Sequence, residues 1–162
     1  MGTGAHARRQ LMMISVLCAL ALGIALYTQR SWDMLPCAWC VLQRAQMALL
    51  VALGLLGFMV PGGLLLSGLS VVSLLVSVSG VAAALWLHFK ASSSTSCALT
   101  LADRIVNGLG LDRAWPEMFT ALASCADAAV NLWGLPYVFY SLGIFLVCCW
   151  LSVQALGSSQ QK

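Results

Sequence analysis

Long apolar stretches alternate with short polar segments along the whole chain. Four of these stretches reach the length of a membrane span, and they cover residues 11–27, 41–60, 64–89 and 137–156. At about 1.5 Å rise per residue, a helix through each one crosses a hydrocarbon core of roughly 30 Å, the first only just. Because a bilayer offers no partners to open backbone groups, each span is predicted to be helical. The pattern predicts an all-α integral membrane protein, a four-transmembrane-helix bundle forming one membrane domain over residues 1–162.

Composition supports this class. Hydrophobic residues make up 61% of the chain and charged residues 8%, whereas about a quarter of the residues in a soluble domain are charged. The formal net charge of +3 comes without a run of basic residues, so composition does not favour a nucleic-acid-binding protein.

The first apolar stretch has two interpretations. Arg8 and Arg9, a short apolar run and the small residues of segment 19–21 resemble a cleavable signal peptide. The apolar run nevertheless continues through Leu22 to Leu26 and does not become polar after the cleavage site that this would require. We therefore predict that the first span is retained as a membrane anchor.

Four spans bring two loops to one side of the membrane. These loops cover residues 28–40 and 90–136, and they contain Cys37, Cys40, Cys97 and Cys125. A count of Lys and Arg does not decide the orientation, but Arg8 and Arg9 flank the first span to emerge. Cysteines that form disulfides belong in an oxidising compartment. We predict that both termini are cytoplasmic and that both cysteine loops face the oxidising side.

The longer loop contains one amphipathic segment. Apolar residues recur there at helical spacing, at Leu99, Ala102, Val106 and Leu109. This spacing predicts a short helix at the membrane surface, which Gly108 and Gly110 terminate. The following Trp115-Pro116 pair predicts an extended or turning path.

The segment 36–44, PCAWCVLQR, contains the clearest candidate chemistry. Its Cys-x-x-Cys pair stands where a loop leads into the second span, and the positive end of a helix dipole favours a thiolate there. In a helix, Arg44 lies on the same face as Cys37 and Cys40, where its guanidinium can stabilise a thiolate or a developing anion. We predict that Cys40 is the better stabilised thiolate and that Cys37 is the more accessible, exchanging thiol.

Alternatives to redox chemistry are weaker. A zinc site needs four ligands, usually from a second Cys-x-x-Cys or a His pair, and we predict no metal. A structural disulfide between Cys37 and Cys40 would close too small a ring to restrain much chain entropy. Arg44 could reach the interface merely by extending its side chain, although charges within spans are functional candidates by default.

The other cysteines and one histidine remain open to two readings. A Cys97–Cys125 disulfide would stabilise its loop by roughly 3 kcal/mol in the chain-entropy model, or it could exchange with another protein; the sequence does not decide between these roles. Cys18, Cys148 and Cys149 lie inside spans, where cysteine usually acts as a small apolar residue. His88 could touch a bound cofactor or form a hydrogen bond at the interface.

This ordered set of features resembles the DsbB-type disulfide bond formation proteins of the bacterial inner membrane. The resemblance covers the four spans, the Cys37-x-x-Cys40-x-x-x-Arg44 motif, the Cys97/Cys125 pair, and the segments 115–119 and 133–136. It implies a membrane enzyme that reoxidises a periplasmic thioredoxin-fold dithiol oxidase of the DsbA type. The implied electron acceptor is a membrane quinone, either ubiquinone or menaquinone.

The resemblance also implies residue roles. Cys97 is the cysteine attacked by the reduced partner, Cys125 is its resolving mate, and electrons pass from there to Cys37. Cys40 lies next to the quinone, Arg44 matches an arginine associated with quinone binding, and His88 is a looser match. Gln43 replaces an acidic residue found in some members.

Two rival interpretations follow from the same features. A quinone reductase of the vitamin-K-epoxide type also uses four helices, a Cys-x-x-Cys motif and a loop cysteine pair. In that family the motif is expected in the last helix, whereas here it opens the second span. The other rival is a non-enzymatic four-span protein in which the loop disulfides are structural.

Overall fold

Four long helices form the body of the computed structural model, which describes residues 3–60, 63–89, 101–124, 131–132 and 134–160. These helices are α1 (Thr3–Trp32), α2 (Ala38–Met59), α3 (Leu64–Phe89) and α7 (Tyr137–Gln160). All four are long and apolar enough to cross a membrane. The predicted four-helix bundle is therefore confirmed, and α1 extends beyond its predicted span at both ends.

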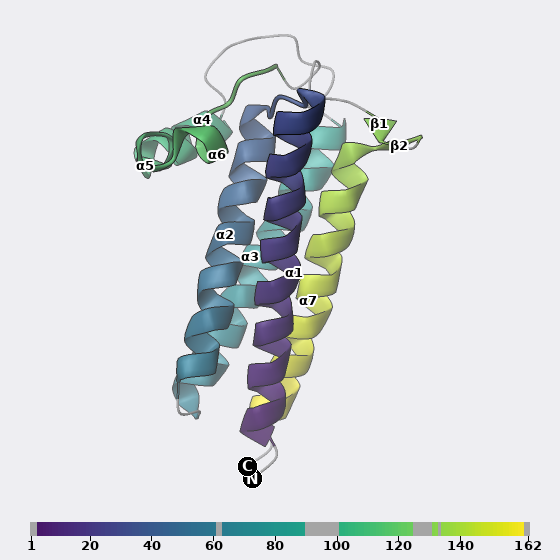
Figure 1. Cartoon of the computed structure of the whole chain (residues 1–162). Coiled ribbons are helices and arrows are strands. Elements are labelled where there is room, and N and C mark those ends of the chain that lie inside the picture. The colour runs from purple at the N-terminus through teal and green to yellow at the C-terminus, as the bar shows by residue number, and fades with distance from the viewer. Residues whose placement is uncertain (1–2, 61–62, 90–100, 125–130, 133, 161–162) are drawn as a thin grey trace.

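The helices pack as a closed ring. Helix α1 contacts α2 and α7, and α3 contacts the same two neighbours from the other side. The start of α1 and the end of α7 lie at one end of the bundle, while the connection after α1 and the described part of the connection after α3 lie at the other (Figure 1). This arrangement gathers both cysteine-bearing connections at one end.

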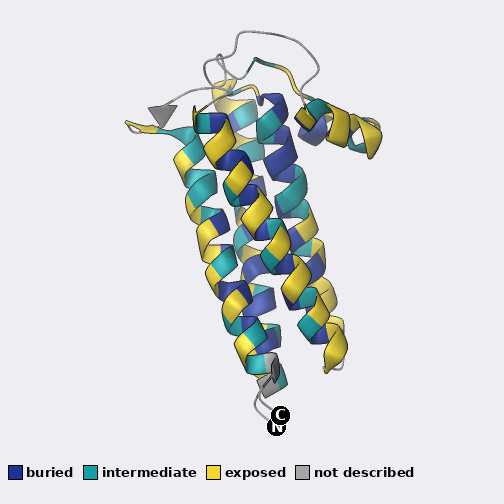
Figure 2. Ribbon diagram, turned by 180° about the vertical axis from the view of Figure 1, so that it is seen from behind, coloured by how far each residue is buried: buried dark blue, intermediate teal, exposed yellow. Residues whose placement is uncertain are grey.

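The outward surface of the bundle is apolar, unlike that of a soluble helical protein. Exposed residues run along the outside of the helices for most of their length (Figure 2). Large apolar side chains on every helix are among them, including Leu20, Leu55, Leu75, Leu146 and Trp150. An exposed apolar surface of this extent suits contact with lipid.

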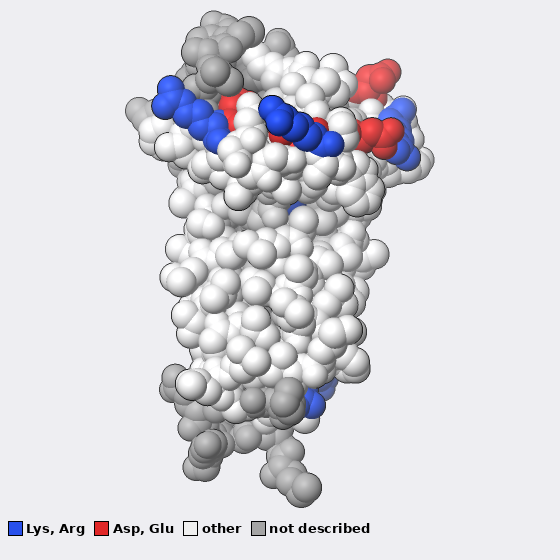
Figure 3. Space-filling view, turned by 90° about the vertical axis from the view of Figure 1, so that its left-hand side faces the viewer, with Lys and Arg blue, Asp and Glu red and all other residues white. Residues whose placement is uncertain are grey.

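Charged side chains are segregated toward the two ends. On the face shown in Figure 3, Asp and Glu lie together with Lys and Arg at one end, only Lys and Arg are seen at the other, and a broad, largely uncharged band separates the two. Such a band is what a hydrocarbon layer requires, because an unpaired charge there is costly.

Small residues allow the helices to approach one another closely. A Cβ atom on Gly54 would lie 2.5 Å from the Leu11 carbonyl oxygen, and one on Gly57 would lie 2.6 Å from Leu11 Cδ1. Gly80 of α3 likewise faces the ring of Phe145, which is fully buried on α7. Since lipid removes the hydrophobic drive for helix association, such close packing is a principal source of stability.

The connection after α3 contains three short helices beside the first turns of α2 (Figure 1). They are α4 (Leu101–Gly108), α5 (Leu111–Ala114) and α6 (Pro116–Phe119). The predicted amphipathic helix is present, and Ala102 and Val106 are its buried residues. It ends at Gly108, as predicted, and Gly110 adopts a left-handed conformation with φ 67° before α5. Trp115 leaves the helical conformation, with φ −148° and ψ 80°, and the chain re-enters a helical turn at Pro116.

A two-residue hairpin precedes the last helix, and the sequence pattern does not predict it. Strands β1 (Asn131–Leu132) and β2 (Leu135–Pro136) pair antiparallel, with Leu132 opposite Leu135. Gly134 has φ 85°, a conformation that glycine adopts without a steric penalty. The hairpin delivers the chain into α7 at Tyr137.

We expect Gly80→Ala to lower the stability of the bundle, because the new methyl group would overlap the Phe145 ring. Overpacking of this kind costs about 1–3 kcal/mol. Gly68→Ala on the same helix is the matched control, since nothing lies within 4 Å of its Cβ position. Thermal unfolding in detergent, followed by circular dichroism, should show a lower midpoint for Gly80→Ala alone. Equal midpoints would contradict the proposed packing.

Candidate functional site

The Cys-x-x-Cys pair forms the N-terminal cap of α2. Cys37 has extended backbone angles, φ −85° and ψ 171°, and its sulfur accepts a hydrogen bond from the Cys40 backbone N–H at 3.4 Å. The Sγ atoms of Cys37 and Cys40 lie 2.9 Å apart. The motif therefore lies at a helix N-terminus, as predicted, where the positive end of the helix dipole favours negative charge on sulfur.

The relative exposure of the two cysteines is the reverse of our prediction. Cys37, predicted to be the more accessible thiol, is 0% exposed, whereas Cys40 is partly exposed. Cys37 packs with Leu87 of α3, and Trp39 and Val138 flank this small cluster. The prediction was wrong because contacts from α3 and α7 bury the cap residue, and local sequence does not reveal such contacts.

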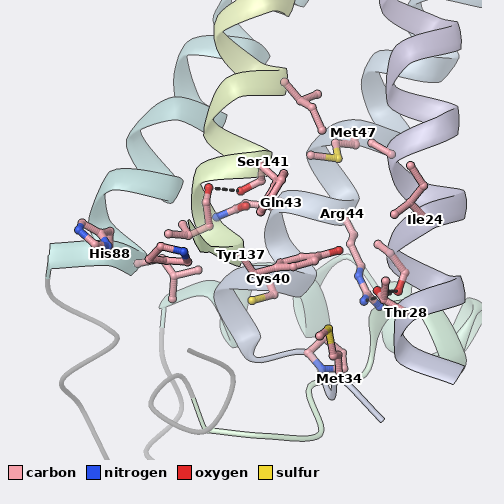
Figure 4. A pocket seen from close by; sticks show the side chains of 18 of the residues that line it. Ile24, Thr28, Met34, Cys40, Gln43, Arg44, Met47, His88, Tyr137 and Ser141 are labelled. Atoms are coloured by element: carbon pink, nitrogen blue, oxygen red, sulfur yellow. Dashed lines mark hydrogen bonds between the residues drawn. The ribbon is translucent and has the colours of Figure 1, made fainter. Parts of the chain in front are cut away.

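Cys40 opens into a cavity of about 240 Å³ between the helices. All four long helices and the segment 34–36 contribute to its lining. Most of the wall is apolar and includes Ile24, Met47 and Ile144, with a smaller number of polar side chains. Figure 4 shows Arg44 toward α1, Gln43 toward α7, and Tyr137 beside Cys40. A mainly apolar cavity with a few convergent polar groups is typical of a small-molecule site.

Arg44 is a buried cation at the wall of this cavity. It is 8% exposed, and its guanidinium donates to Gln29 Oε1 at 2.6 Å, to the Met118 carbonyl at 3.4 Å and to the Ala25 carbonyl at 3.4 Å. These acceptors belong to α1 and α6, so one side chain of α2 ties three segments together. Arg44 is therefore not a side chain that merely extends to the membrane interface, which was the alternative to a functional role.

The connection after α3 is attached to the chain directly beside the Cys37–Cys40 pair. The backbone N–H groups of Leu122 and Ala123 both donate to the Pro36 carbonyl, at 2.9 and 3.3 Å. Arg30 forms an ion pair with Glu117. These contacts join the loop after α3 to the residue that precedes Cys37.

The structure brings four of the six predicted site residues to one region. Cys40, Arg44 and His88 all line the cavity, and Cys37 lies behind Cys40. Cys97 and Cys125 lie outside the described residues. His88 stands at the edge of the cavity, away from Arg44 (Figure 4), with its ring 4.9 Å from those of Phe89 and Phe139.

Three residues that help form the site have no role predicted from the sequence. Gln43 and Tyr137 line the cavity, and Gln29 is the nearest acceptor for Arg44. One signal could have indicated Gln43, because a polar side chain one turn inside an apolar span is a functional candidate. Nothing in the local sequence places Tyr137 beside Cys40 or pairs Gln29 with Arg44.

Two of the remaining cysteines belong to the core. Cys18 and Cys148 are both 0% exposed, and their sulfur atoms lie 3.6 Å apart between α1 and α7. Cys149 is partly exposed on α7. The burial of Cys18 and Cys148 agrees with their predicted role as small apolar residues.

Comparisons with known proteins all identify relatives of one family. The sequence model of the family described as "Disulfide bond formation protein DsbB" matches residues 7–155. Disulfide bond formation protein B of Dechloromonas aromatica (strain RCB) is 34% identical over 78% of this chain and 76% of its own length. Disulfide bond formation protein B 1 of Pseudomonas syringae pv. syringae (strain B728a) is 28% identical over 96% of this chain and 92% of its own length. No solved structure matches this chain significantly.

We expect Gln29 and Arg44 to be energetically coupled, since their 2.6 Å hydrogen bond involves a charged donor. A double-mutant cycle with Gln29→Leu and Arg44→Met should give a coupling free energy of about 1.5–3 kcal/mol in unfolding experiments in mild detergent. Gln46→Leu in place of Gln29→Leu is the control, because Gln46 donates to Ser79 on α3. Additive effects of Gln29→Leu and Arg44→Met would argue against the contact.

Proposed function

Because the chain belongs to the DsbB family of disulfide bond formation proteins, we propose that it acts as a protein-disulfide:quinone oxidoreductase. It is a multi-pass membrane protein with four spans. In the proposed reaction it reoxidises a DsbA-like dithiol protein in the periplasm. Two cysteine pairs of the chain then pass the electrons to ubiquinone or menaquinone in the bacterial inner membrane.

The observation that carries this proposal is the shared cavity of Cys40 and Arg44. A sulfur at a helix N-terminus and a buried guanidinium both face one mainly apolar space within the membrane-spanning bundle. This space lies where a water-soluble thiol pathway and a lipid-soluble oxidant must meet. A purely structural disulfide does not need such a cavity beside it.

The residues of the cavity fit a quinone. The volume of about 240 Å³ is somewhat below that of typical sites for whole drug-sized ligands, and so suits one ring with its tail in lipid. Apolar side chains would contact the ring, while Arg44 and other polar groups would face its oxygens. When bound, a quinone supplies an acceptor for two electrons and two protons.

The proposed relay within the chain consists of thiol–disulfide exchanges. A thiolate of the reduced partner attacks the Cys97–Cys125 disulfide at Cys97, and the second partner thiol displaces Cys97, leaving the partner oxidised. The Cys125 thiolate then attacks Cys37 of the Cys37–Cys40 disulfide and displaces Cys40. The Cys97 thiolate next attacks Cys125, which re-forms the Cys97–Cys125 disulfide and releases Cys37. Each exchange breaks one S–S bond and forms one. The two electrons and two protons finally leave the Cys37–Cys40 dithiol, which closes again to a disulfide.

Two features support a role for Cys40 at the end of this relay. Cys40 lines the cavity and lies beside Cys37, whereas Cys37 is enclosed by neighbouring side chains. The N-terminus of α2 and the nearby guanidinium favour negative charge on the Cys40 sulfur once the disulfide opens. The attachment of Leu122 and Ala123 to Pro36 supports the preceding exchange, because Cys125 follows Ala123 by two residues.

The proposed orientation places the dithiol on the periplasmic side. Arg8 and Arg9 belong to the opposite end of the bundle, where cytoplasmic positive charge is expected. Stable protein disulfides form on the oxidising side of the membrane. The termini are therefore assigned to the cytoplasm.

We expect Cys40→Ser to abolish quinone reduction, since the second disulfide could no longer form. The assay uses purified protein, a reduced DsbA-like donor and a short-chain ubiquinone or a menaquinone, with quinol formation followed by absorbance. Cys97→Ser should be equally inactive. Cys149→Ser is the control for a thiol outside the relay and should retain wild-type turnover. Activity in Cys40→Ser would exclude the proposed route, and an inactive wild-type protein with both quinones would favour a non-enzymatic role.

We expect Arg44→Met to raise the quinone KM at least about tenfold, because a hydrogen bond to a charged group contributes about 1.5–3 kcal/mol. The KM for the reduced protein donor should change much less. Steady-state rates measured with each substrate varied in turn separate the two effects. Arg30→Met is the control, since Arg30 is an exposed partner of Glu117. An unchanged quinone KM would remove Arg44 from the quinone site.

A further inference from the structure

Gln43 is a buried amide whose donor group is unused. The side chain is 4% exposed, and its Nε2 atom has no hydrogen-bond partner among the described residues. Leaving a buried polar group unpaired is costly, and most such groups in proteins have a partner. Gln43 also lines the cavity that contains Cys40 and Arg44. An unpaired donor in the wall of a ligand-sized cavity suggests that the ligand supplies the acceptor.

The helix geometry sets Gln43 and Arg44 on opposite sides of Cys40. They follow Cys40 by three and four residues, so at 3.6 residues per turn they are rotated about 60° to one side and about 40° to the other. Figure 4 agrees, because Arg44 extends toward Thr28 of α1 while Gln43 extends toward Ser141 of α7. A ring placed over Cys40 would therefore have one nitrogen-bearing side chain on each flank.

Two hydroxyl groups of the cavity wall, one on the α1 side and one on the α7 side, already donate hydrogen bonds within their own helices. The Thr28 hydroxyl donates to the Ala25 carbonyl at 3.1 Å, and the Ser141 hydroxyl donates to the Val138 carbonyl at 2.8 Å. Both bonds lie within the helix that carries the hydroxyl. These two groups are thus less suited than the Gln43 amide to donate to a ligand on the α7 side.

We infer that the Gln43 amide donates a hydrogen bond to one carbonyl of the quinone, while Arg44 faces the other carbonyl. This inference rests on the proposed function and adds a second recognition residue to it. A para-quinone carries its two carbonyl groups at opposite ring positions, which matches donors on opposite flanks of Cys40. Gln43 and Arg44 would together orient the ring and select for para-quinones.

The test measures the affinity for a quinone and the hydrogen bonding of its two carbonyl groups, without turnover. Oxidised full-length protein in detergent is titrated with a short-chain ubiquinone, and the Kd is read from the quenching of tryptophan fluorescence. Infrared spectra of the same probe, isotopically labelled at one carbonyl carbon at a time, report the hydrogen bond at each oxygen. Gln43→Leu removes the donor at similar size, and Gln43→Met is a second variant in case the first does not fold. Gln46→Leu, one turn further along α2, is the matched control.

The expected result is a Kd about threefold to tenfold higher in the Gln43 variants, in keeping with the loss of one neutral hydrogen bond. One labelled carbonyl band should move toward its frequency in an apolar solvent, and the other should stay in place. Arg44→Met should move the other band. Gln46→Leu should leave the Kd and both bands unchanged.

Three outcomes would overturn the inference, and they differ in what else they exclude. If the probe binds the wild-type protein, and Arg44→Met but not Gln43→Leu weakens binding, the role of Gln43 is excluded and the proposed function stands. If Gln43→Leu weakens binding and neither carbonyl band moves, Gln43 acts on cavity shape only. If neither ubiquinone nor a short-chain menaquinone binds the wild-type protein, the proposed function fails together with the inference.

Discussion

A cation buried inside a membrane-spanning helix must find oxygen acceptors, and this requirement organises the functional end of the molecule. Arg44 lies in the second turn of α2, and its acceptors are the Gln29 side chain and the backbone carbonyls of Ala25 and Met118. Burial in a low-dielectric environment makes each of these bonds more valuable than it would be in water. The position of α1 and α6 relative to the dithiol therefore depends on one guanidinium. The cavity wall between α1 and α2 depends on it as well.

Close contacts at glycine residues hold the helices together along the rest of the bundle. The hydrophobic effect that drives the folding of a soluble protein gives an apolar side chain in a membrane little preference for contact with another helix over contact with lipid. Gly54 instead allows α2 to approach the backbone of α1 at Leu11, while Gly57 and Gly80 leave room for the side chains of Leu11 and Phe145. The result is a closely packed bundle with a cavity at one end, where side chains from four helices meet.

The spans, the loop helix and the position of the Cys-x-x-Cys motif could be predicted because each is encoded by local periodicity. Residues 64–89 form a helix with the predicted bounds, and the dithiol caps α2. The features that sequence analysis missed depend on contacts between distant segments. The burial of Cys37 comes from Leu87 and Val138, and the environment of Arg44 comes from Gln29 and Met118. No pattern within one helix reports which residue of another helix lies opposite.

The full burial of Cys37 has a consequence for which thiols can supply electrons. A sulfur without accessible surface is shielded from small thiols dissolved in the surrounding water. In the proposed relay, its attacker is a cysteine of the same chain, delivered by a loop that is already bonded to Pro36. Such an intramolecular reaction proceeds at an effective concentration that free thiols do not reach. The fold would thereby prevent direct reduction of the Cys37–Cys40 pair by free thiols. The electrons that reach the quinone would then come from proteins in which a disulfide has been made.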